Sequence, residues 1–177
     1  MPDFHLVGEE TVYDGHIMRV VVGTFAGPDG DTFTRDVIRH PGAVAVLPLH
    51  DDGTVTLVRQ YRAALDAPLL EIPAGIRDVD GEPPAETARR ELAEEAGLAA
   101  TQIEHLLSFH NAPGMSDEVV DVYVATGLSE VDAAAQGVEE EAMSIERHHL
   151  DDLAAMVADG RLTDAKTVIA VSLLRAR

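Results

Sequence analysis

Cysteine is absent from all 177 residues of the chain. The absence excludes disulfide bonds, zinc sites built on thiolates and a cysteine nucleophile. It also excludes redox chemistry by thiols, although by itself it indicates little about the cellular compartment. Any reaction that this protein performs must rely on other side chains.

Long apolar runs are missing as well. No window of about 18 apolar residues is present to span a bilayer. The first ten residues, MPDFHLVGEE, lack the basic and then apolar regions of a signal peptide. We therefore expect no membrane segment and a cytoplasmic location.

Positive charge is scarce, because 13 basic side chains stand against 32 acidic ones and the net charge is −19. Such a surface repels nucleic acid and anionic lipid. Neither nucleic acid nor a membrane is expected as a partner. Most of the carboxylates are consistent with a solvated acidic surface that aids solubility.

The residues that are present predict one compact domain rich in strands, because 46% of them are hydrophobic and can fill a core. No internal repeat is found. β-Branched residues predict an antiparallel meander of three strands at residues 5–14, 16–25 and 32–40. The sequence AGPDGD between the last two has the composition of a turn.

Two further strands are predicted at residues 43–49 and 54–62, joined by HDDG, which has hairpin turn chemistry. The first of them is an apolar run and should be buried on both faces. Three later segments are short enough for strands, at residues 103–110, 118–126 and 142–150. Two segments show helical spacing, at residues 150–160 and 164–177. The order of strands, helix, strands and helices predicts an α/β or α+β sandwich with a mixed sheet.

An acidic helix is predicted in the segment GIRDVDGEPPAETARRELAEEAGL, residues 75–98. On a helical wheel an apolar stripe contains Ala85, Ala88, Leu92 and Ala96. Glu91 and Glu95 border this buried stripe, whereas Glu94 lies farther toward solvent. Arg90 lies nearly opposite the stripe and is four residues before Glu94, so it can form an ion pair with that side chain.

Two partly buried carboxylates one turn apart repel each other, and their burial is costly unless something compensates. A divalent cation is the simplest compensation. Oxygen ligands without His or Cys indicate Mg²⁺ or Mn²⁺ rather than zinc.

The segment resembles the signature of the Nudix hydrolases, which is Gly, a spacer, Glu, seven residues and then Arg-Glu-aliphatic-x-Glu-Glu-x-Gly-aliphatic. The matching positions are Gly75, Glu82, Arg90, Glu91, Leu92, Glu94, Glu95, Gly97 and Leu98. One departure is present, because six residues rather than five separate Gly75 from Glu82. We interpret it as an insertion in the loop before the helix.

Segments outside this signature resemble the ADP-ribose pyrophosphatases of that family, in the same order: HPGAVAVLPL, VRQYR, LLEIPAG and DAKT. Pro113, sixteen residues after Gly97, resembles the proline that marks specificity for ADP-ribose. The loop 112–118, which also contains Gly114, resembles the substrate loop.

The resemblance implies an α/β/α sandwich with a mixed central sheet over residues 41–177. It implies that residues 1–40 form antiparallel strands that serve a homodimer and help to build the adenine site. An extra hairpin on a monomer is the alternative.

The implied reaction is metal-dependent hydrolysis of ADP-ribose to AMP and ribose 5-phosphate. Glu91 and Glu95 would be the principal metal ligands, with the carbonyl of Ala74 as a backbone ligand and Glu94 as a further ligand or its partner. Two or three Mg²⁺ ions, or Mn²⁺ ions, would act at the diphosphate. The general base would come from a later loop, where Glu139, Glu140 and Glu141 are candidates and Glu140 is favoured by its alignment; a solvated loop is the alternative.

For substrate binding, Arg59 and Arg62 stand out in an acidic chain, because arginine matches phosphate oxygens. Alternation along the strand places them on opposite faces. We assign the phosphate contact to Arg62, held by Glu71, against the alternative of a surface salt bridge. Arg35 and Arg39 are weaker candidates from the N-terminal strands, and the eight histidines are interpreted as structural or surface groups.

Two other functions remain open at this point. One is hydrolysis of another nucleoside diphosphate sugar, which depends on the pocket and not on the signature. The other is a sensor that binds a metabolite without turnover. The complete set of acidic residues favours an enzyme over a sensor.

Overall fold

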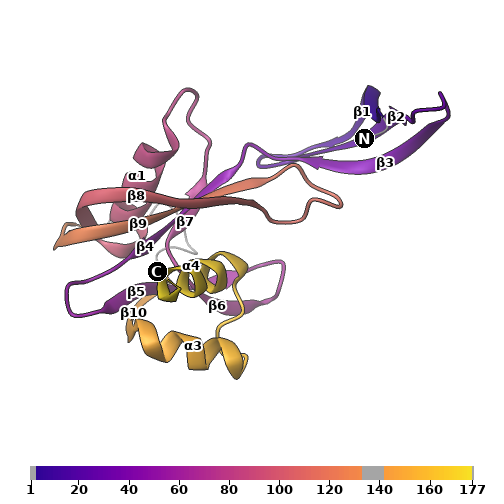
Figure 1. The fold of residues 1–177 in the computed structure, drawn as a ribbon. Helices are drawn as coiled ribbons and strands as arrows, with labels where there is room; N and C mark the ends of the chain where they lie inside the picture. Colours follow the sequence, from indigo (N-terminus) through magenta and orange to yellow (C-terminus); the bar gives the residue numbers. More distant parts are fainter. Residues whose placement is uncertain (1–2, 133–141, 177) are drawn as a thin grey trace. The chain divides into compact units, whose positions relative to one another are not determined.

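A computed structural model of the protein describes residues 3–132 and 142–176 (Figure 1). The described elements are β1 (His5–Asp14), β2 (Arg19–Ala26), β3 (Thr32–Arg39), β4 (Ala43–Pro48), β5 (Thr54–Arg62), β6 (Ala67–Glu71), β7 (Ala74–Ile76), α1 (Pro84–Ala96), β8 (Leu98–His110), β9 (Val119–Glu130), β10 (Ser144–His149), α3 (Leu150–Ala158) and α4 (Ala165–Arg175). The chain divides into two compact units. Unit 1 contains residues 1–42 and 109–119, and unit 2 contains residues 43–108 and 120–177.

Unit 1 is built on an antiparallel sheet in the order β1-β2-β3, which confirms the predicted meander. Residues 27–31 make the turn between β2 and β3, where the amide of Gly27 donates to the carbonyl of Asp31 (2.8 Å). The loop 109–119 pairs with the end of β3, because the Ile38 amide donates to the Met115 carbonyl (2.7 Å). Val21 is fully buried in this unit, whereas every residue of the edge strand β1 is exposed.

Unit 2 contains two sheets, one in the order β7-β4-β9-β8 and one in the order β10-β5-β6. The first sheet is mixed, because β4 pairs antiparallel with β7 and parallel with β9. Residues Val44 to Leu47 of β4 are all fully buried, which confirms the prediction that this strand is covered on both faces.

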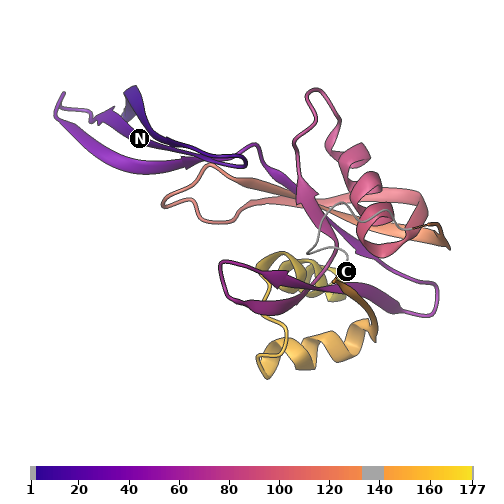
Figure 2. The same cartoon turned by 180° about the vertical axis from the view of Figure 1, so that it is seen from behind.

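Helices cover this mixed sheet. Side chains of α1, including Ala88 and Leu92, pack in one cluster with Val44 and Val46 of β4. Ala45 and Leu47, which alternation places on the opposite face, are buried as well, and α4 also packs against β4. In both views α1 lies toward the top of the four-stranded sheet and α4 lies below the sheet (Figure 1 and Figure 2). The arrangement is the expected α/β sandwich.

The structure differs from the sequence-based prediction at β4 and β5. The turn at 50–53 forms, with the His50 amide donating to the Thr54 carbonyl (2.8 Å), but the two strands meet only at the bridge between Leu49 and Val55. They then enter different sheets, because β4 takes β7 and β9 as neighbours and β5 takes β6 and β10. The expectation of a hairpin is therefore wrong beyond its turn.

The strands β6 and β7 were not predicted from the sequence. β7 has only 3 residues, too few for an alternation pattern. β6 contains Pro68, which is tolerated because β6 is an edge strand.

In the described ranges, no helix is long and apolar enough to cross a membrane.

Candidate active site

The acidic helix α1 has clear start and stop signals. Pro83 is the N-cap, with an extended backbone, and Pro84 occupies the first helical position. Gly97 ends the helix with a left-handed backbone (φ 61°), and its amide donates to the carbonyl of Ala93 (3.1 Å). These signals fix where the helix begins and ends.

Glu91 and Glu95 lie on the buried side of α1, with 8% and 6% of their surfaces exposed. The wheel placed them at the border of the apolar stripe, and the structure confirms this. Glu94 is half-buried, as its position on the wheel predicts. Gly75 on β7 packs directly against the Glu91 carboxylate.

The Glu95 carboxylate is tied to the backbone of Ala74, whose amide donates to Oε2 (2.8 Å). Burial, followed by the nearby negative charges of Glu91 and Glu71, raises the pKa of Glu95 to about 8. The amide of Ala74 and the positive charge of Arg62 oppose the rise. This carboxyl group therefore lies in a site with too little positive charge to stabilise its ionised form.

Arg90 lies among carboxylates. It donates to Glu94 (3.0 Å), which is the ion pair that the sequence predicted, and also to Glu91 (2.8 Å) and Asp78 (3.4 Å). Burial alone would lower the pKa of Arg90, but the surrounding carboxylates outweigh it and the pKa is raised. Arg90 thus links two of the candidate metal ligands.

Arg62 at the end of β5 forms a bidentate pair with Glu71 at the end of β6. Nε donates to Oε1 (2.7 Å) and Nη2 to Oε2 (2.6 Å). Glu71 is completely buried, whereas 38% of the Arg62 side chain is exposed. The predicted contact between the two residues is present, and it leaves Arg62 accessible to solvent at the acidic site.

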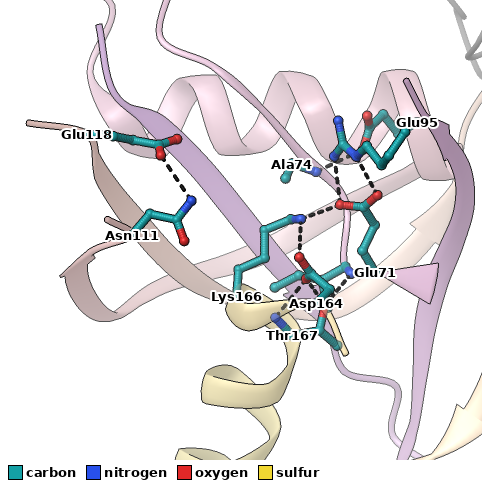
Figure 3. Close-up of polar contacts among 10 residues, drawn as sticks. Glu71, Ala74, Glu95, Asn111, Glu118, Asp164, Lys166 and Thr167 are labelled. Carbon is teal, nitrogen blue, oxygen red and sulfur yellow. Dashed lines mark hydrogen bonds and ion pairs between the residues drawn. The ribbon is translucent and has the colours of Figure 1, made fainter. Parts of the chain in front are cut away.

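Lys166, Asp164 and Thr167 lie at the start of α4, in the segment DAKT, which was noted in the sequence only for its resemblance and was given no role. Lys166 donates to Glu71 and to Asp164 (2.8 Å), and Asp164 caps the helix by accepting from the amide of Thr167 (3.0 Å). Figure 3 shows the Lys166 ammonium reaching both carboxylates. One signal could have revealed this group, because Lys166 is the only lysine in the sequence.

Arg59 belongs to a different environment. Its Nε donates to Glu146 on β10 (2.6 Å), across the pairing of β5 with β10. The alternation argument, which separated Arg59 from Arg62, agrees with these different partners.

The substrate-binding candidates of the N-terminal strands and of the loop 112–118 lie together inside unit 1. A pocket of about 360 Å³ has a lining that includes Arg35, Arg39, His110, Pro113 and Gly114. Arg39 is already paired there, with Glu9 (2.6 Å) and Asp117 (3.0 Å). The hydrogen bonds that Arg39 donates to Glu9 and Asp117 raise its pKa.

Comparison with known proteins places the chain in a family. The model of the NUDIX domain matches residues 39–170, which contain the acidic helix and both arginines of β5. The chain belongs to the NUDIX family. Alignments of this NUDIX protein with its relatives cover nearly its whole length, so the similarity is not limited to the signature.

Two relatives illustrate this similarity. A methanol dehydrogenase activator of Bacillus methanolicus is 40% identical over 166 residues, which cover 94% of this chain and 89% of that protein. An ADP-ribose pyrophosphatase of Mycobacterium tuberculosis is 39% identical over 169 residues, which cover 96% of this chain and 82% of the relative.

A solved structure supports the fold. The crystal structure of an ADP compounds hydrolase matches with a TM-score of 0.83 at 24% identity, covering 98% of this chain and 93% of that one. The α/β sandwich is thus also the fold of a solved hydrolase structure.

NUDIX hydrolases generally use a divalent metal ion. In the described part of this chain, no three acidic or His side chains already converge as a ligand set. The donors nevertheless fit a hard cation, because the buried Glu91 and Glu95 offer only oxygen atoms. Oε2 of Glu82 is also buried and has no hydrogen-bond partner among the described residues.

The candidates for the general base, Glu139, Glu140 and Glu141, lie outside the described residues. Their role stays a prediction from the sequence.

Proposed function

We propose that the protein hydrolyses the diphosphate bond of ADP-ribose, giving AMP and ribose 5-phosphate, with Mg²⁺ as the metal. The observation that carries the proposal is the acidic set on α1, with Glu91 and Glu95 buried, in a chain 39% identical to an ADP-ribose pyrophosphatase over 96% of its length. A sensor without turnover would not need these costly buried carboxylates.

The metal ligands in this proposal are Glu91, Glu95 and the carbonyl of Ala74, with Glu94 as a further ligand or as a partner of one. Two or three Mg²⁺ ions, or Mn²⁺ ions, would be held there. A bound divalent cation neutralises diphosphate oxygens and lowers the pKa of an attacking water. The buried position of Glu91 and Glu95 supports this assignment.

The chain's own residues orient the substrate. Arg62 presents a guanidinium that Glu71 holds by two hydrogen bonds, and its exposed part suits a phosphate oxygen. Arg90 donates to both Glu91 and Glu94, and its positive charge reduces the repulsion between these carboxylates. Arg59 pairs with Glu146 on β10, whereas Arg62 pairs with Glu71 and carries charge close to Glu95, so we assign the phosphate contact to Arg62.

A base must remove the proton from the attacking water. We assign it to one of Glu139, Glu140 and Glu141, with Glu140 as the first to be replaced. Single Glu→Gln variants identify it, because only loss of the base should lower kcat strongly while the KM for ADP-ribose stays near that of the wild type.

Pro113, Gly114 and Arg39 are assigned to recognition of the nucleoside part, because they line one pocket in unit 1.

We also propose that a second copy of the chain covers the N-terminal sheet. The edge strand β1 exposes Leu6, Val7, Val12 and Tyr13, and an apolar edge strand readily pairs with another chain. The proposed place of the reaction is the cytoplasm, where nucleotide metabolites are formed.

The test is product analysis of the purified protein with Mg²⁺. The panel contains ADP-ribose, NADH, diadenosine polyphosphates, UDP-glucose and GDP-mannose, each with an EDTA control. Release of AMP and ribose 5-phosphate from ADP-ribose, faster than from the others and abolished by EDTA, is the expected result. Faster cleavage of another diphosphate would overturn the assignment of the substrate.

One relative favours a second candidate function. The 40% identity to a methanol dehydrogenase activator suggests that the protein activates a dehydrogenase of that class. Adding the purified protein to a methanol dehydrogenase assay tests this candidate. Stimulation that requires Glu95 would place the same site in that role.

A further inference from the structure

The only lysine of the chain lies in a buried cluster of charges. Lys166 follows the N-cap of α4, and only 14% of its side chain is exposed. The twelve other basic residues are all arginines. Lysine side chains are rarely buried without a reason. This lysine nevertheless lies in the interior, next to the proposed active site.

Glu71 requires positive charge because its side chain is only 1% exposed. Arg62 binds both of its oxygens, and Lys166 binds Oε2 as well. Oε2 therefore receives hydrogen bonds from Nη2 of Arg62 and from Nζ of Lys166. The lysine fixes the oxygen atom to which one arm of the Arg62 guanidinium is attached.

Lys166 is itself held on a rigid base. Asp164 accepts from Lys166 through Oδ1, and from the amide and hydroxyl of Thr167 through Oδ2 (3.0 and 2.5 Å). The Thr167 hydroxyl in turn accepts from the amide of Ile72 (2.9 Å), the residue after Glu71. The start of α4 therefore holds both the lysine and the backbone beside Glu71.

We propose that Lys166 is a positioning residue for the diphosphate hydrolysis. By sharing the Glu71 carboxylate with Arg62, it keeps the guanidinium in one orientation for a phosphate of the substrate. Nη1 of Arg62 takes no part in the pair with Glu71 and is the atom best placed for this contact. This inference rests on the proposed function.

The effect of losing Lys166 follows from the geometry. Without the ammonium, Glu71 keeps one cation and can rotate, and Arg62 rotates with it. The arginine then binds the phosphate less well both before and during the reaction, so the KM rises while kcat changes little. The hydrogen bonds of Lys166 go to Glu71 and Asp164, which are not among the proposed metal ligands, so the affinity for the metal should stay unchanged.

The test compares Lys166→Met, which keeps most of the length of the side chain, with Lys166→Arg, which keeps the charge. Lys166→Met should raise the KM for ADP-ribose about tenfold, because this is the expected cost of losing one hydrogen bond to a charged group. Lys166→Arg should bring the KM part of the way back toward that of the wild type. Mn²⁺ affinity, measured by titration calorimetry, should equal that of the wild type. Arg161→Met is the matched control, because Arg161 forms an exposed ion pair with Asp159 shortly before α4.

A double-mutant cycle separates positioning from general stabilisation. If Lys166 acts through Arg62, then Lys166→Met should add no further rise in KM in the Arg62→Ala background. A rise of the same size in both backgrounds, or a KM for Lys166→Met equal to the wild type, would overturn the inference.

A spectroscopic readout does not depend on turnover. Labelling with ¹⁵N-lysine gives a single Nζ resonance, because the chain has one lysine. In EDTA, ADP-ribose should shift this resonance in the wild type and not in Arg62→Ala; a resonance that does not respond overturns the inference even if Lys166→Met fails to fold. If the wild type does not hydrolyse ADP-ribose at all, it is the proposed function that fails, and the kinetic series is repeated on whichever diphosphate of the panel is cleaved.

Discussion

Gly75 and Glu91 are in such close contact that a Cβ atom on Gly75 would lie 2.0 Å from Cδ of Glu91. A real Cβ essentially never approaches another atom so closely, and the group that must yield is the end of a flexible side chain. Glycine at position 75 is therefore required by the position of the carboxylate. The glycine that opens the Nudix signature has a direct steric reason in this protein.

Gly75→Ala should move the Glu91 carboxylate without unfolding the protein. We expect about a tenfold loss of Mn²⁺ affinity, as for an altered neighbour of a metal ligand, with a nearly unchanged melting temperature. Titration calorimetry and thermal unfolding measure the two quantities. Gly8→Ala is the control, because no atom lies within 4 Å of a Cβ there, and an unchanged Mn²⁺ affinity in Gly75→Ala would contradict the steric argument.

Glu95→Gln should abolish metal-dependent turnover while the fold stays intact. The amide has nearly the shape of the carboxyl group but cannot supply a negative oxygen to a cation. Steady-state hydrolysis of ADP-ribose and circular dichroism test the two parts of this prediction. Turnover equal to the wild type would remove Glu95 from the set of metal ligands.

The metal-free protein should lose stability as the pH rises from about 4.5 to about 8. The unfolded chain releases the Glu95 proton near pH 4.5, whereas the folded protein keeps it until about pH 8. In this window the unfolded state binds fewer protons, so the free energy of unfolding falls by up to about 1.4 kcal/mol per pH unit and then levels off.

Urea unfolding in EDTA at a series of pH values measures this slope. The other carboxylates also change with pH, so the informative quantity is the difference between the wild type and Glu95→Gln. That difference should grow from pH 5 to pH 8. A constant difference would show that Glu95 has an ordinary pKa.

The dimer proposal makes a separate prediction. Val12→Glu places a charge on the exposed edge strand β1, where 59% of Val12 is accessible in the single chain. We expect the wild type to sediment as a dimer and the variant as a monomer. Glu10→Gln on the same strand is the control and should leave the dimer intact; a monomeric wild type would refute the proposed association.

The contacts of the site show how far local sequence reasoning reaches. Arg90 and Glu94 are one helical turn apart, so their ion pair could be predicted from helical spacing. The contact of Arg62 with Glu71 was also predicted, but the pairing of β5 with β6 that brings the two residues together was not. Lys166 is 95 residues from Glu71, and no local period relates them. Only the packing of α4 beside β6 brings this cation to the carboxylate.

The sequence by itself determined the position and buried face of the acidic helix, the N-terminal meander and the family. Helix periodicity, capping residues and strand alternation depend on near neighbours, and these patterns are written in the local order of residues. Tertiary structure alone decided that β4 and β5 enter different sheets and that Glu71 has two cations as partners. Such choices depend on the competition among distant segments for the same hydrogen bonds and buried charges, which no local pattern records.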